Sequence, residues 1–133
     1  MKTKLHLFLA ALALILISGC ATSRSEKLPA GDIDMFSEFK DEIATLHNTA
    51  LTPNSKAKYD AALTLYRNVD FSYVRDLVSL ERIFSARDAH LGEKNYEKQN
   101  VIFLYRYKDK RVRFVFVRFN NSIIHSECTD LIE

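Results

Sequence analysis

The spacing of apolar residues changes its period at Gly92, and this change constrains the fold more than any other feature of the chain. Between residues 32 and 91, apolar side chains recur every three or four positions, which is the period of an amphipathic helix. After Gly92 the spacing becomes the two-residue alternation of a strand, seen most clearly at Val112, Phe114 and Phe116. Helices followed by a run of strands predict an α+β fold.

The helical part is expected to contain two or three helices. Asp32 is a suitable cap for the first, whose apolar face recurs at three- and four-residue steps: Ile33, Phe36, Phe39, Ile43 and Leu46. Thr52 and Pro53 end this segment and start the next helix, because proline favours the first helical position.

Two further helices are expected at residues 53–67 and 71–88. Their apolar residues lie close to a heptad stripe: Tyr59, Leu63, Tyr66, Tyr73, Leu77, Leu80 and Phe84. The segment 68–70 (Asn-Val-Asp) offers a stop and a new cap between them, and globular helices seldom exceed about 20 residues. Because neither glycine nor proline occurs between residues 54 and 91, one continuous helix remains an alternative.

The strand-forming part is expected to be a three-stranded antiparallel meander after a polar loop at residues 93–99. The predicted strands are residues 101–107, 112–119 and 122–127. Lys108–Lys110 is expected to form the first turn. Asn120-Asn121 suits the second, because asparagine tolerates positive φ.

The first twenty residues carry a different signal. Lys2 and Lys4 precede 13 residues, Leu5–Ile17, that are apolar apart from His6. A membrane-spanning helix needs about 20 apolar residues, whereas a run of 13 fits the apolar centre of a secretory signal peptide. Ile17-Ser-Gly-Cys20 then places small residues beside a thiol, which can accept a diacylglycerol group.

This segment resembles the signal and lipobox of bacterial lipoproteins. The resemblance implies a signal peptide at residues 1–19 and a mature chain that begins at Cys20, acylated on its sulfur and amino terminus with fatty acids such as palmitate. Two or more acyl chains anchor a protein stably in a membrane. Ala21, in place of aspartate, implies sorting to the outer membrane, with the domain facing the periplasm. Residues 20–31 are expected to form a flexible lipidated tether, and residues 32–133 a single α+β domain.

Charge is distributed unevenly along a neutral mature chain. After Lys2 and Lys4 leave with the signal peptide, 17 Lys and Arg balance 17 Asp and Glu, so the composition gives no reason to expect a nucleic-acid partner. Residues 26–42 carry six anions and two cations. Residues 98–118 carry one anion, Asp109, and seven cations: Lys98, Arg106, Lys108, Lys110, Arg111, Arg113 and Arg118.

Two interpretations of this basic hairpin remain open. Lys and Arg commonly protect the solvent face and edges of a sheet. The functional hypothesis is a surface for an anionic partner, formed by Arg106, Lys108, Lys110, Arg111, Arg113 and Arg118. An acidic protein, lipid phosphates and peptidoglycan carboxylates all have the required charge.

Catalytic and metal-binding patterns are not found in the sequence. His47, His90 and His125 are scattered and do not have metal-ligand spacing, so we expect no metal and no cofactor. Ser126 lies beside His125, but neighbours in a strand face opposite ways. If Cys20 is acylated, Cys128 has no partner within the chain. It is expected to be a buried thiol, with an intermolecular disulfide as the alternative.

The closing strand pattern is also similar to a known group. Its segments begin at Phe103 (Phe-Leu-Tyr-Arg-Tyr), Val112 (Val-Arg-Phe-Val-Phe-Val) and Phe119 (Phe-Asn-Asn-Ser-Ile-Ile), and they resemble the meander of the small outer-membrane lipoproteins of the β-barrel assembly machinery. The glycine-containing segment that precedes the strands in that group is absent, so no functional residue is transferred.

The sequence as a whole predicts a non-enzymatic outer-membrane lipoprotein that binds an envelope protein or an anionic envelope component as an accessory or structural factor. The alternative is an inhibitor or immunity-type lipoprotein directed against a toxin or hydrolase in the periplasm.

Overall fold

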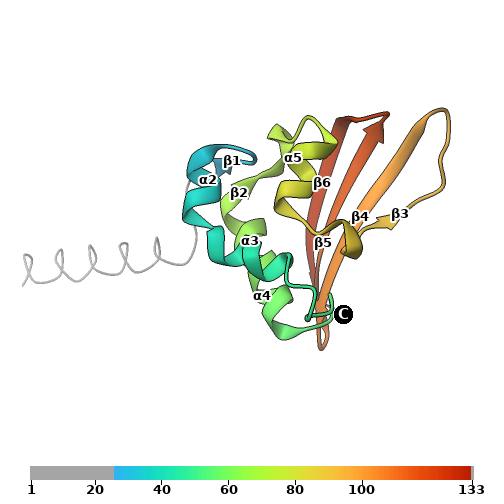
Figure 1. Cartoon of the computed structure of the whole chain (residues 1–133). Helices are drawn as coiled ribbons and strands as arrows, with labels where there is room; N and C mark the ends of the chain where they lie inside the picture. The colour runs from blue at the N-terminus through green and yellow to red at the C-terminus, as the bar shows by residue number, and fades with distance from the viewer. Residues whose placement is uncertain (1–25, 133) are drawn as a thin grey trace, which may run out of the picture.

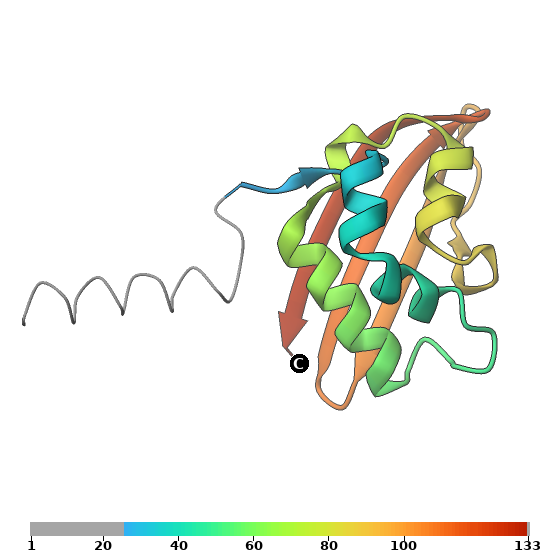
Figure 2. The same cartoon turned by 60° about the vertical axis from the view of Figure 1, so that its left-hand side comes forward.

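A computed structural model describes residues 26–132 and shows a layer of helices packed on one face of an antiparallel sheet (Figures 1 and 2). The helices are α2 (Ile33–Glu38), α3 (Lys40–Leu46), α4 (Lys56–Asn68) and α5 (Leu77–Ile83), with 3-10 turns η1 (Phe71–Tyr73) and η2 (Ala86–Asp88). The strands are β1 (Leu28–Pro29), β2 (Val69–Asp70), β3 (His90–Leu91), β4 (Lys98–Tyr107), β5 (Lys110–Phe119) and β6 (Ser122–Ile132). The expected α+β class is confirmed.

The main sheet has four strands in the order β3-β4-β5-β6, one more than expected. The additional strand, β3, pairs with β4 through only two residues. The predicted turns are confirmed, and Lys108 and Asn120 adopt positive φ angles of 56° and 55°. The last strand continues to Ile132 rather than ending at residue 127, because its pairing with β5 extends along the whole of that strand.

The core lies between the sheet and the helices. Alternate side chains of the two central strands point into it: Val101, Phe103, Tyr105, Val112, Phe114 and Phe116. Phe84, just after α5, stacks on Phe103 with ring centroids 4.5 Å apart. Phe71 of η1 contacts Phe114 edge-on at 5.1 Å. The alternation read from the β5 sequence is therefore the alternation of the structure.

The first predicted helix is divided in two. Phe39 leaves helical geometry, with φ −110° and ψ 28°, and separates α2 from α3. Its side chain is 6 % exposed. The next helix also starts later than expected, because Ser55, rather than Thr52, caps α4 by accepting a hydrogen bond from the Lys58 N–H at 3.2 Å.

The segment that follows α4 excludes the continuous helix over residues 53–90. Val69 and Asp70 leave α4 as the extended strand β2, and Val69 is buried. Asp70 does act as a cap, but of the short turn η1. Helix α5 begins later, where Asp76 accepts a hydrogen bond from the Ser79 N–H at 2.7 Å. The predicted helix 71–88 is thus shortened to seven residues because Phe71 and Phe84 both turn into the core.

The expected boundary between tether and domain at Asp32 is wrong. Leu28–Pro29 pairs in parallel with β2, and the Ala30 N–H donates to the Asp70 carbonyl at 3.0 Å. Ala30 is 5 % exposed. The packed domain therefore includes residues 28–31. The earlier part of the expected tether and the acylation site Cys20 lie outside the described residues.

Candidate binding surface on the helix-free face of the sheet

The helices cover only one face of the sheet (Figures 1 and 2). Strand register assigns the outward side chains to the other face, which we call the open face. Its members include Asn100, Ile102, Leu104 and Arg106 of β4, Arg111, Arg113, Val115 and Val117 of β5, and His125, Glu127, Thr129 and Leu131 of β6. No described helix packs against this face.

The centre of the open face is aliphatic. Ile102 lies directly opposite Val115, and Leu104 opposite Arg113, across β4 and β5. An antiparallel sheet with one solvated face normally alternates apolar and polar residues, whereas strands covered on both faces have nearly continuous apolar runs. Residues 101–105 and 114–117 are such continuous runs. These two strands therefore have the composition of strands covered on both sides, although helices cover only one.

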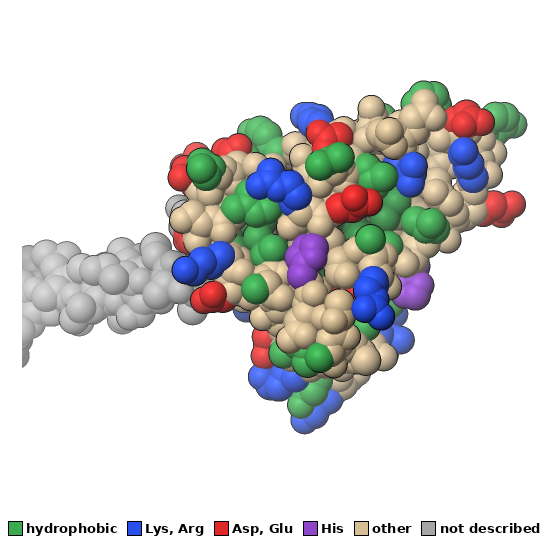
Figure 3. Space-filling model, in the orientation of Figure 1, with side chains coloured by type: hydrophobic (Ala, Val, Ile, Leu, Met, Phe, Trp, Pro, Cys, Tyr) green, Lys and Arg blue, Asp and Glu red, His purple; other side chains and the backbone are tan. Residues whose placement is uncertain are grey.

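Arginines surround one end of this aliphatic centre. Arg106 lies directly opposite Arg111, and Arg113 is the next residue of β5 on the same face. Like charges opposite one another across strands are destabilising. Lys108 lies in the adjoining turn, with its Nζ 5.4 Å from the centre of the Tyr107 ring. Figure 3 shows Lys and Arg side chains at the lower end of the molecule, around this turn.

The six predicted cations do not form a single surface. Lys110 and Arg118 have the same strand parity as Val112 and Phe114, so they belong to the helix-facing side. Arg118 lies at the far end of β5, where its Nε donates to the Asn120 carbonyl at 3.0 Å. It lines a shallow hollow of about 200 Å³ next to α5, together with Glu81. The predicted site is therefore reduced to Arg106, Arg111 and Arg113, with Lys108 beside them.

Two helices of the opposite layer, α2 and α3, are acidic. Asp34 lies in the first turn of α2, and Asp41 and Glu42 lie in the first turn of α3. Figure 3 shows Asp and Glu side chains at the upper left, over α2. The charge asymmetry of the sequence is thus an asymmetry in space, with acidic helices on one side and the basic end of the open face on the other.

A buried ion pair joins α4 to the turn η2, just before the sheet begins, and the sequence did not predict it. The Lys58 Nζ lies 2.7 Å from the Asp88 carboxylate, and the two side chains are 2 % and 8 % exposed. Burial and the nearby Asp88 raise the pKa of Tyr105, whose hydroxyl lies beside this pair without a hydrogen bond of good geometry in the described structure. Because these groups are closed to solvent, the cluster supports the core rather than a reaction.

Cys128 lies on the helix-facing side of β6, opposite Phe114. It is half-buried and has no cysteine partner among the described residues. Burial raises the pKa of its thiol to about 12, so the thiol stays protonated at neutral pH. Since the thiolate is the reactive form, this environment favours the structural interpretation of Cys128.

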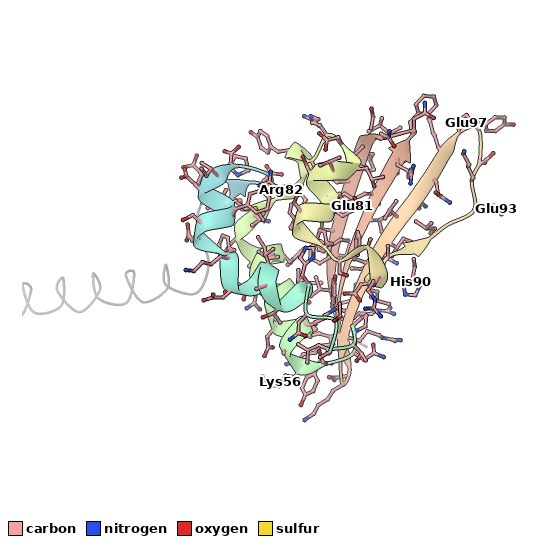
Figure 4. The ribbon with its side chains drawn as sticks, viewed as in Figure 1. Lys56, Glu81, Arg82, His90, Glu93 and Glu97 are labelled. Carbon is pink, nitrogen blue, oxygen red and sulfur yellow. The ribbon has the colours of Figure 1, made fainter. Side chains whose placement is uncertain are left out.

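The connection between β3 and β4 stands away from the sheet and leaves a hollow of about 600 Å³. Glu93 and Glu97 project from this connection (Figure 4). Tyr96, at the tip, is 88 % exposed and has a positive φ of 51°. The hollow has a largely polar lining that includes Lys94, Asn95 and Lys98. It is open to solvent, and no buried catalytic group faces it among the residues that line it.

The histidines are dispersed in the structure as in the sequence. His47 Nε2 lies 3.3 Å from the Arg82 carbonyl, while His90 and His125 are exposed on different strands. Within residues 26–132, no three His, Cys, Asp or Glu side chains lie close enough together to hold a metal ion.

Helix α4, with 13 residues, is the longest described helix. None of the helices in the described part has the length and hydropathy needed to cross a membrane. Comparison with known proteins finds no family model, no curated protein and no solved structure that matches this chain.

Proposed function

We propose that this protein is a lipid-anchored accessory protein of the bacterial envelope, which binds another envelope component without catalysing a reaction. The proposed anchor is acylated Cys20, in the outer membrane, with the domain in the periplasm. The support for the anchor comes from the sequence of residues 1–20, which lie outside the described residues. The support for binding comes from the open face.

A single observation carries the binding proposal: aliphatic side chains occupy the helix-free face of an antiparallel sheet. Ile102, Leu104, Val115 and Val117 lie together on adjacent strands and are only half-buried. Covering apolar surface is favourable by roughly 25 cal/mol per Å², and contiguous exposed apolar patches commonly mark interaction sites. The guanidinium and aliphatic groups of the open face suit binding of a partner. The buried ion pair of Lys58 and Asp88, in contrast, is closed to solvent in the core of the described structure.

The test is capture of envelope components by the acylated protein. Replacing Arg106, Lys108, Arg111 and Arg113 with glutamine removes the basic end of the open face. Each exposed ion pair contributes about 0.2–1 kcal/mol, so four together should weaken capture by about tenfold or more. Raising the salt concentration from 0.1 M to 1 M should have a similar effect, because the Debye length falls from about 10 Å to about 3 Å.

A matched control places four glutamines on exposed cations of the helix layer: Lys40, Arg67, Arg75 and Arg87. This variant should retain capture, because it leaves the open face unchanged. If capture survives both the open-face substitutions and high salt, these arginines do not bind the partner and only protect the solvent face of the sheet.

A further inference from the structure

We infer that the occupant of the open face is a protein segment that combines aliphatic side chains with carboxylates, rather than a lipid or a glycan. This inference rests on the proposed function and specifies the partner. Three features of the described structure carry it: the aliphatic centre, the arginines beside it, and the side of the domain on which the described chain begins.

The aliphatic centre requires an apolar counterpart. Ile102, Leu104 and Val115 form a contiguous patch across β4 and β5. A glycan would place hydroxyl groups against this patch, and those groups would lose water without gaining hydrogen-bond partners from it. Side chains of a protein segment can cover the patch and exclude water, as residues do at the centre of protein interfaces.

The exposed guanidinium of Arg113 favours a carboxylate partner. Arg113 is exposed and directly adjoins the aliphatic patch, where it lies opposite Leu104. A carboxylate can accept two parallel hydrogen bonds from one guanidinium, and such charge-assisted pairs are stronger and more specific than neutral ones.

The position of the chain start disfavours the anchoring membrane as the occupant. The described chain enters through β1 on the helix side of the sheet, and the open face points the other way (Figures 1 and 2). Five residues, 21–25, separate the proposed acylation site from Glu26. The six steps along the chain from Cys20 to Glu26 span at most about 20 Å. A tether of this length keeps the point where the described chain begins, on the helix side, within about 20 Å of the anchoring membrane.

The test is site-specific photocrosslinking of the full lipoprotein in its own cells. Val115→benzoyl-phenylalanine places the probe in the aliphatic patch. Val78→benzoyl-phenylalanine is the matched control, because Val78 is 69 % exposed on α5, in the helix layer. We expect adducts from position 115 and not from position 78. The crosslinked peptide of the partner should contain aliphatic residues and an excess of Asp and Glu.

Charge dependence is measured in the same experiment. Arg113→Glu should reduce the adduct from position 115 by about tenfold or more, because an attraction becomes a repulsion. Arg67→Glu, an exposed arginine of α4, should leave the adduct unchanged. Arg113→Gln removes the charge without introducing repulsion, and it provides the comparison if the Arg113→Glu protein fails to fold. A partial loss is then expected.

The remaining outcomes contradict the inference. Adducts to lipid, to glycan or to a second copy of this chain would each identify a different occupant. So would adducts to a protein segment without excess negative charge, or adducts that persist in both Arg113 variants. If capture from envelopes continues but position 115 gives no adduct, the binding site lies elsewhere. If neither capture nor adducts occur, the proposed function itself fails.

Discussion

Lys58 and Asp88 are 30 positions apart in the sequence, and they meet inside the protein at 2.7 Å. Lys58 lies on the buried side of α4, among Tyr59, Ala62 and Leu65. Asp88 ends the short turn η2, which comes just before β3 in the chain. At the scale of single residues, this pair ties α4 to the segment that enters the sheet, so its loss should affect folding rather than binding.

Lys58→Met should lower the free energy of unfolding by about 3–5 kcal/mol, because it leaves the Asp88 carboxylate buried without a counter-charge. The double variant Lys58→Met with Asp88→Leu should recover most of this loss, since apolar replacements of a buried pair are often neutral or stabilising. Urea unfolding of both variants, and of Asp88→Leu alone, measures the coupling energy. A single substitution that costs less than about 0.5 kcal/mol, the range of ordinary surface changes, would contradict a supporting role.

At the scale of elements, the two-residue strand β1 explains how residues before the first helix belong to the domain. Leu28 lies beside Val69, and the next residues place Ala30 in the core. Composition did not predict that these residues pack on the domain, because residues 26–31 contain few large apolar side chains. A parallel pair this short depends on the position of its partner strand, which the end of α4 fixes.

A chain that begins at Asp32 should therefore melt below one that begins at Glu26. It loses the pairing of β1 with β2 and the hydrogen bond from Ala30 to Asp70. Each lost hydrogen bond contributes about 1 kcal/mol, and a domain of this size loses roughly 4–8 °C for each kcal/mol. Thermal denaturation followed by circular dichroism tests the expectation. Equal melting temperatures would mean that residues 26–31 contribute nothing to stability.

At the scale of the whole molecule, two opposite surfaces follow from one arrangement of layers. The acidic α2 and α3 lie in the helix layer, and Arg106, Arg111 and Arg113 lie on the far face of the sheet. The molecule thereby has a basic, partly aliphatic side that lies opposite the acidic helices α2 and α3.

Cys20→Ala should abolish incorporation of labelled palmitate and release the protein from the membrane fraction. The expectation follows because the cysteine sulfur carries the diacylglycerol group in the lipoproteins that residues 1–20 resemble. Cys128→Ala is the control and should keep full labelling, because that thiol lies half-buried in β6. Palmitate labelling that persists in the Cys20→Ala protein would contradict the assigned anchor.

The features that local sequence determined are those that depend on neighbours in the chain. The alternation in β5 and the turns at Lys108 and Asn120 were predictable, because side-chain direction and tolerance of positive φ are local properties. The sides of Lys110 and Arg118 could also have been predicted, since they share the parity of Val112. The continuous apolar runs of β4 and β5 were a further signal, which pointed to a second covered face.

The tertiary structure alone decided the features that depend on distant residues. The helix breaks at Phe39, whose side chain packs into a core that includes residues of the sheet. The predicted stripe of Tyr59, Leu63 and Tyr66 does pack on the core, but the buried face of α4 also includes Lys58, which meets Asp88 there. The open face exists because every described helix packs on the other side of the sheet. Periodicity gives each element its apolar direction, but only packing determines which of two apolar sheet faces is covered.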